Sequence, residues 1–154
     1  IHGRQGFKFS AQERQALRTF LENGGVLFGD AICASRTFAE SFRREMSLIL
    51  PNDTLRRLPP DHVMFTDEYD GFDLTTITLR TPSARSKSQM AEILETHGSP
   101  HVEAIHINGR LAVAFSPYDL SCALENQISI ECKGYSRLDA ARLGSNIILF
   151  SLQQ

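Results

Sequence analysis

The sequence predicts an α/β fold: a three-layer sandwich on a mostly parallel, doubly wound sheet with one antiparallel hairpin. Helical and strand-like segments alternate in the first half of the chain, and a hairpin followed by a long helix fills the second half. A length of 154 residues suits one domain, residues 1–154, with a sizeable core. Because the chain begins with Ile1, we expect a domain excised from a longer protein and lacking its first strand.

The first half contains two helices around a strand. Ser10 and Glu13 form a capping box, and apolar residues recur at helical spacing until the Asn-Gly-Gly run at 23–25. The apolar run at 26–28 indicates a short buried strand. The spacing of apolar residues over 38–49 then predicts the buried face of a second helix.

The second half is less regular. β-Branched residues over 74–81 predict a strand, and the polar stretch at 83–100 indicates a surface loop with a short helix. Two strand-like runs at 102–107 and 110–116 flank Asn-Gly, which is typical of a tight hairpin. The last helix, capped by Ser136, is apolar over much of its circumference, so we expect it to be well buried.

Composition excludes some classes of function. A net charge of −2 gives no electrostatic basis for nucleic-acid binding, and no apolar run is long enough for direct membrane insertion. Glycine-rich phosphate loops and the spaced histidines or cysteines of common metal sites are missing from the sequence. We therefore expect no cofactor and no metal, and a small molecule or a protein as the partner.

Polar side chains follow two predicted strands. Asp30 and Cys33 come directly after the first-half strand, and Asp119 and Cys122 follow the second strand of the hairpin. Ligands bind at the carboxyl ends of strands in open α/β sheets, so we expect these residues to share one rim. The ligand-binding residues predicted from the sequence are His2, Asp30, Cys33, His62, Arg110, Ser116, Asp119 and Cys122.

Motifs spread over nearly the whole chain resemble a bacterial family of uncharacterised domains known only as a domain of unknown function. The matching pieces, in order, are His2-Gly3, residues 21–28, Asp30, Cys33, Phe38, Phe42-Arg43, residues 58–62, residues 108–113, residues 116–122 and residues 142–148. The resemblance implies a flavodoxin-like fold similar to class I glutamine amidotransferases and trehalose-utilisation proteins. It also implies a larger envelope-associated protein, and hence a periplasmic or cell-envelope location.

Two functions compete on this evidence. The leading hypothesis is a non-catalytic module, on an amidotransferase-like scaffold, that binds a ligand or a protein. The rival is a cysteine-dependent hydrolase or amidotransferase relative in which Cys33 is the nucleophile, His62 or His101 the base, and Glu103 orients His101. The Gly-x-Cys-x-Gly elbow of such enzymes is missing around Cys33, which favours the binding module.

The three cysteines do not form a disulfide framework, because none belongs to a Cys-x-x-Cys pair. Two pairings stay open from the sequence. Cys122 and Cys132 could meet, and a purely structural domain with a redox-sensitive Cys33–Cys122 pair is a third possibility beside the two functions above.

Overall fold

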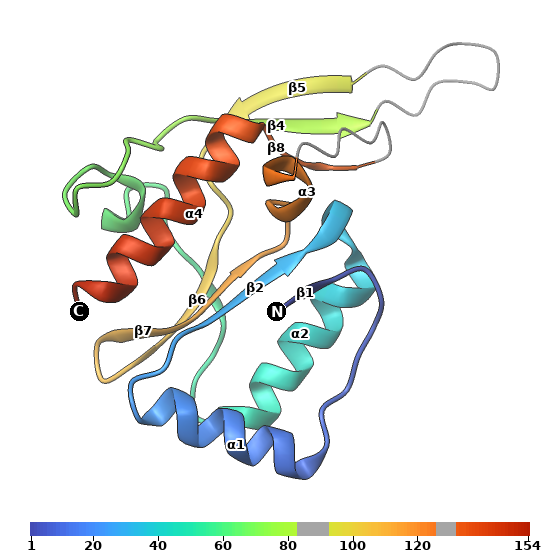
Figure 1. Ribbon diagram of the computed structural model, residues 1–154, viewed down its shortest axis with the longest axis vertical. Coiled ribbons are helices and arrows are strands. Elements are labelled where there is room, and N and C mark those ends of the chain that lie inside the picture. The colour runs from blue at the N-terminus through green and yellow to red at the C-terminus, as the bar shows by residue number, and fades with distance from the viewer. Residues whose placement is uncertain (83–92, 126–131) are drawn as a thin grey trace.

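A computed structural model describes residues 1–82, 93–125 and 132–154 of the chain (Figure 1). In chain order its elements are β1 (His2–Gly3), α1 (Ala11–Glu22), β2 (Leu27–Ala31), the 3-10 helix η1 (Ile32–Ala34), α2 (Arg36–Ile49), β3 (Arg56–Arg57), the 3-10 helix η2 (Val63–Phe65), β4 (Ile77–Pro82), β5 (Ile93–Gly98), β6 (Glu103–Ile107), β7 (Arg110–Ser116), α3 (Ser121–Leu124), β8 (Gly134–Tyr135) and α4 (Arg137–Leu152). The mixed α/β class is therefore confirmed.

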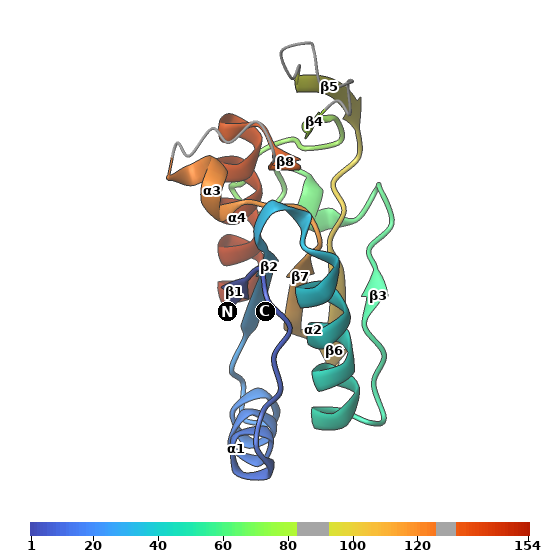
Figure 2. The ribbon, with the colours of Figure 1, turned by 90° about the vertical axis from the view of Figure 1, so that its right-hand side faces the viewer.

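The main sheet has five strands in the order β1-β2-β7-β6-β3, and Figure 2 shows them side by side in this order. β1 pairs with β2 and β2 with β7 in parallel, whereas β6 pairs antiparallel with β7 on one side and with β3 on the other. The hairpin β6–β7 turns at Asn108 and Gly109, as the sequence predicts, and both residues have positive φ. Two of the four strand pairings are thus parallel and two are antiparallel, so the expectation of a mostly parallel, doubly wound sheet is not confirmed.

A second, antiparallel sheet of three strands, β5-β4-β8, was not predicted. Its strand β5, residues 93–98, lies where the sequence indicated a loop with a short helix, so that prediction is wrong for this stretch. Residues 83–92 of the predicted loop lie outside the described part of the chain. β8 contributes only two residues, too few for any periodic pattern to show.

Helices cover both faces of the main sheet, which gives the three layers that the sequence predicted. Neighbouring residues of a strand point to opposite faces, and Ala104 and Ile105 of β6 accordingly belong to two separate apolar clusters. The cluster of Ala104 includes Leu143 and Ile147 of α4, and the cluster of Ile105 includes residues of α1 and α2, such as Phe42.

The two long helices that flank the sheet differ in how completely they are buried. α2 buries one face, with Phe42 and Ile49 fully inaccessible. α4 buries Leu143 but leaves Ile148 and Leu152 exposed, so the prediction that this helix is well buried holds for one side only. Among the described residues, none of the helices has the length and hydrophobicity that a bilayer crossing requires.

Candidate functional site

The candidate site lies where β2 and β7 end. The two strands are parallel and in register, with Asp30 of β2 opposite Ser116 of β7. Their carboxyl ends therefore meet at one edge of the sheet, and the segments that follow them, η1 and α3, start side by side. The structure brings Asp30, Cys33, Asp119 and Cys122 together at this edge.

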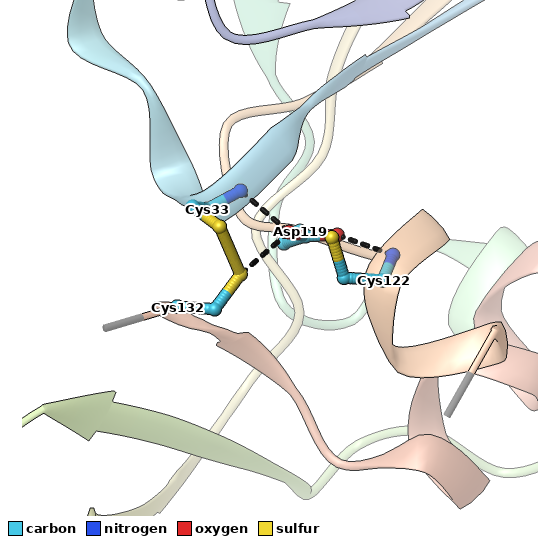
Figure 3. A group of neighbouring side chains, drawn as sticks. All are labelled: Cys33, Asp119, Cys122 and Cys132. Carbon is cyan, nitrogen blue, oxygen red and sulfur yellow. Dashed lines mark hydrogen bonds between the residues drawn. A yellow bond between two sulfur atoms is a disulfide. The ribbon is translucent and has the colours of Figure 1, made fainter. Parts of the chain in front are cut away.

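Asp119 lies at the centre of this group and is 1% exposed. One carboxylate oxygen accepts the backbone N–H of Cys33 at 2.5 Å, and the other accepts the backbone N–H of Cys122 at 2.8 Å (Figure 3). The backbone of Asp119 bridges to Gly134, and its carbonyl accepts the N–H of Tyr135 at 3.1 Å. Asp119 thus holds three segments together, η1 and α3 through its carboxylate and β8 through its backbone.

Cys33 and Cys132 form a disulfide, and Cys122 is the free cysteine beside it (Figure 3). The structure therefore contradicts both pairings that the sequence left open, Cys33–Cys122 and Cys122–Cys132. Burial raises the pKa of the Cys122 thiol to about 12, and the neighbouring carboxylate of Asp119 adds to that effect. In this state neither Cys33 nor Cys122 carries a thiolate at neutral pH.

The turn that delivers Cys33 is strained. Cys33 and Ala34 have φ values of 54° and 55°, in the left-handed region that costs a residue with a side chain about 1 to 2 kcal/mol. Two restraints hold this turn, the hydrogen bond from Cys33 to Asp119 and the disulfide to Cys132. Backbone strain of this kind persists only where the surroundings over-determine it.

Asp30, 3% exposed, organises the start of α3. Its carboxylate accepts the N–H of Leu120 at 3.1 Å and both the N–H and the hydroxyl of Ser121, at 3.0 and 2.7 Å. Burial raises the pKa of Asp30, and these three hydrogen bonds oppose the rise. The sequence offered no signal for Ser121, because its partner is 91 residues away.

An open pocket of about 180 Å³ lies next to Asp30. Its polar lining residues are His2, Asp30 and Ser121, and its remaining lining residues are Ile1, Phe28, Leu120, Leu124 and Gly144. His2 is opposite Asp30 in the parallel pair β1–β2. The structure thus places His2, a predicted site residue, at the same rim as Asp30.

His101 and Glu103, the predicted dyad, lie next to each other, but Glu103 also binds Arg43. His101 Nε2 lies 3.6 Å from Glu103 Oε1, while the Arg43 guanidinium donates to both oxygens of Glu103, at 2.8 and 2.5 Å. Burial acts to raise the pKa of Glu103, but the hydrogen bonds from Arg43 and His101 outweigh it and hold the pKa at about 2. Arg43 is therefore the main partner of this carboxylate.

Two predicted site residues lie elsewhere. His62 is next to His106, with ring centroids 6.2 Å apart, and His106 is opposite Leu111 at the start of β7. Leu111 and Ser116 are about 16 Å apart along an extended strand. The structure does not bring His62 to the rim or to Cys33, because it lies near His106 at the other end of the sheet.

Arg110 also lies at that far end, as the first residue of β7, and the structure does not bring it to the rim. Its guanidinium donates to the carbonyls of Leu21 and Gly25, at 2.6 and 3.1 Å, where α1 ends. Ser116 does lie at the rim end of β7, but it is fully buried and its hydroxyl donates to the carbonyl of Tyr118 at 2.5 Å. Both side chains therefore have structural partners.

Cys132 is the residue at this site that the sequence analysis missed as a partner of Cys33. It precedes the two-residue strand β8, whose pairing with β4 carries it to the rim. The odd number of cysteines was the one available signal, because it leaves one thiol unpaired whichever pair forms.

Comparison with known proteins gives a family and no named relative. A search of curated proteins found no match. The family model described as a domain of unknown function, DUF4159, matches residues 1–152, which is nearly the whole chain and includes every residue of the rim. The chain therefore belongs to the DUF4159 family.

Proposed function

We propose that this domain is a non-catalytic protein-interaction module that holds one apolar side chain of a partner protein in the pocket beside Asp30. The observation that carries the proposal is the size of the pocket. Its volume of about 180 Å³ is close to that of a cavity of about 150 Å³ that binds benzene. Pockets for drug-sized ligands start at about 300 Å³, so this one suits a single side chain better than a whole cofactor.

Exposed apolar side chains near the pocket support a protein partner. Leu124, which lines the pocket, is 46% exposed, and Ile148 is 59% exposed. Ile148 lies one helical turn after Gly144, another lining residue, so the two are neighbours on the surface of α4. A partner that placed an apolar anchor in the pocket would also cover these side chains, which is the usual arrangement of an interface centre.

The scaffold that we infer for this module is amidotransferase-like. It is supported by the three parallel strands β1, β2 and β7 with the rim at their carboxyl ends. The absence of a reactive thiol in this state favours binding over catalysis, because Cys33 is in a disulfide and the pKa of Cys122 is raised to about 12.

Binding in the pocket can be tested by filling the pocket with a larger side chain. A Cβ added at Gly144 meets no atom within 4 Å, so Gly144→Leu should fill the pocket without disturbing α4, and Gly144→Ala is the matched control. Toluene is the probe, and its binding is measured by the changes in backbone amide chemical shifts. We expect saturable shifts at Phe28, Leu120 and Leu124 in the wild type and Gly144→Ala, and none in Gly144→Leu. Identical shifts in Gly144→Leu, or none in the wild type, would contradict the proposal.

The partner can be tested with the same pair of variants. A photo-crosslinking residue, p-benzoylphenylalanine, is placed at position 148 in cells that make the host protein. We expect a protein adduct that persists with Gly144→Ala and disappears with Gly144→Leu. An adduct that still forms with Gly144→Leu, or no adduct with the wild-type pocket, would count against an interaction through this pocket.

The rival hypothesis of a cysteine-dependent hydrolase is tested by alkylating the reduced protein with iodoacetamide over a range of pH. If Cys33 acts as a nucleophile, it should react readily below pH 7. We expect it to react only at higher pH, which agrees with a binding module.

A further inference from the structure

All three cysteines of the chain gather around one carboxylate (Figure 3). Ligand atoms of Cys33, Cys122, Cys132 and Asp119 all lie within 4.8 Å of one another. Four donors bound to one tetrahedral zinc ion, at about 2.0 to 2.3 Å, lie about 3.5 to 3.8 Å apart. Three thiolates with one carboxylate form a donor set that suits a soft or borderline divalent cation.

The backbone that carries these donors is fixed before any ion arrives. Asp119 accepts the N–H groups of Cys33 and Cys122, and its own carbonyl accepts the N–H of Tyr135. Gly134 permits this approach, because a Cβ there would lie 2.6 Å from the Asp119 carbonyl oxygen. The ligand-bearing segments are therefore held together by backbone contacts as well as by the disulfide.

A hollow of about 10 Å³ lies beside the cluster, lined by Arg80, Asp119, Cys122, Ala123, Cys132, Gly134 and Tyr135. That volume is about the minimum that accommodates one water molecule, so it matches a single ion and no larger ligand. Three of the four candidate donors, Asp119, Cys122 and Cys132, line this hollow. The Cys33–Cys132 disulfide alone does not require such a space.

We propose that, when the Cys33–Cys132 disulfide is reduced, Cys33, Cys122, Cys132 and Asp119 bind one zinc-like divalent cation, and that the ion and the disulfide exclude each other. The two states are exclusive because a disulfide sulfur carries no thiolate charge to donate. This site is separate from the apolar pocket, and the proposal does not rest on the proposed function.

The chemistry of the switch balances with an external dithiol as reductant. The dithiol gives two electrons and two protons to the Cys33–Cys132 bond and leaves as its own cyclic disulfide. The three thiols then release three protons to solvent as the cation binds. An opposing oxidant of the disulfide class would reverse both steps and expel the ion.

Local charge favours a cation in the reduced state. The carboxylates of Asp119, Asp30 and Glu125 all place negative charge near Cys122. A divalent cation at the cluster would be attracted by this charge and would stabilise the thiolates that bind it. Arg80, on the wall of the hollow, would offset part of the negative charge that remains on the complex.

The experiment titrates Co²⁺ and then Zn²⁺ into the intact domain, reduced in one arm and oxidised in the other. Reduced wild type should bind one equivalent of Co²⁺, with thiolate charge-transfer and tetrahedral visible bands that Zn²⁺ abolishes. Oxidised wild type should show neither band. No binding by the reduced protein, or equal binding by both forms, would overturn the proposal.

Cys122→Ser separates the metal site from the disulfide, because it removes one donor and leaves the Cys33–Cys132 bond intact. We expect this variant to form the disulfide normally, which shows that it folds, and to bind Co²⁺ at least about tenfold more weakly when reduced. The matched control, His62→Ala with His106→Ala, removes two imidazoles at the far end of the sheet and should bind like wild type. Wild-type affinity in Cys122→Ser would overturn the assignment of the ligands.

Discussion

Asp119 and Cys33, 86 residues apart in the sequence, are joined by a 2.5 Å hydrogen bond from the Cys33 backbone N–H to a buried carboxylate oxygen. The other oxygen accepts the N–H of Cys122 at 2.8 Å. The same side chain therefore fixes the turn after β2 and the start of α3. Both proposals depend on this arrangement, because the pocket and the cysteine cluster lie on either side of α3.

Replacing Asp119 should destabilise the fold. Asp119→Ala leaves the partly buried N–H groups of Cys33 and Cys122 without acceptors, at about 1 to 3 kcal/mol for each if it were fully buried. We expect the free energy of unfolding to fall by about 2 to 4 kcal/mol in urea denaturation of the oxidised protein. Asp119→Asn, which keeps one acceptor oxygen, should lose less.

The exposed carboxylate Asp67 provides the control for that measurement. Asp67→Ala should change the free energy of unfolding by less than about 0.5 kcal/mol, as surface substitutions usually do. Equal losses for Asp119→Ala and Asp67→Ala would mean that the two N–H groups find other acceptors when the carboxylate is removed.

The disulfide should contribute measurably to stability. Cys33 and Cys132 are separated by 99 residues, and closing a loop of that length in the unfolded chain is worth up to about 4 to 5 kcal/mol. We expect Cys132→Ser, or a dithiol reductant on the wild type, to lower the free energy of unfolding by about 3 kcal/mol. Cys122→Ser should lower it much less, and peptide mapping without reduction should link Cys33 to Cys132. A Cys33–Cys122 peptide would contradict the structure.

Local signals were sufficient for much of the fold. The capping box of Ser10 and Glu13 starts α1 one residue after the cap, and the Asn-Gly pair at 108–109 turns the hairpin. The meeting of Asp30 with Asp119 also followed from the sequence, since Asp30 lies near the end of one strand of the buried type, Asp119 follows another, and parallel strands end together. In each of these cases the decisive information lies within a few residues.

Long-range pairing was not readable in the same way. β3 and β8 have two residues each, so neither shows a period, yet β8 brings Cys132 to Cys33. The place of His62 depended on which strand its loop packs against, and the sequence does not contain that information locally. The exposed side of α4 was missed for a similar reason, because an apolar face predicts burial only if a partner element is present.

Gly71 should not tolerate a side chain. A Cβ at this position would lie 2.6 Å from Oδ1 of Asn146, a buried amide of α4. That amide accepts the N–H of Phe72 and donates to the Phe72 carbonyl, each at 2.8 Å, and donates to the Met64 carbonyl at 2.9 Å. Gly71→Ala must displace it, and we expect a loss of about 1 to 3 kcal/mol in thermal or urea unfolding.

Gly98→Ala is the matched control for this substitution, because a Cβ at Gly98 meets no atom within 4 Å. It should be neutral or slightly stabilising, since alanine restricts the unfolded chain more than glycine does. A neutral Gly71→Ala would show that the amide of Asn146 can move without losing its hydrogen bonds.

The ion pair of Arg43 and Glu103 should make stability depend on pH in the acid range. The pKa of Glu103 is lowered from 4.5 to about 2 in the folded protein, where the hydrogen bonds from Arg43 outweigh the effect of burial. The folded state therefore binds this proton less readily than the unfolded state, and its advantage is present above pH 4.5. It should disappear as the pH falls from about 4.5 to about 2. Arg43 is partly exposed, so we expect a loss of about 2 kcal/mol rather than the full value of the shift.

Urea unfolding between pH 6 and pH 3 measures this dependence. Glu103→Gln removes the titrating group, so the variant should be less stable than wild type at pH 6, and the difference should shrink steadily as the pH is lowered. Arg36→Gln breaks the exposed pair with Glu40, whose side chains are 91% and 58% exposed, and should leave the slope unchanged. A constant difference between wild type and Glu103→Gln down to pH 3 would mean that Glu103 titrates alike in the folded and unfolded chains, and that Arg43 does not hold its charge.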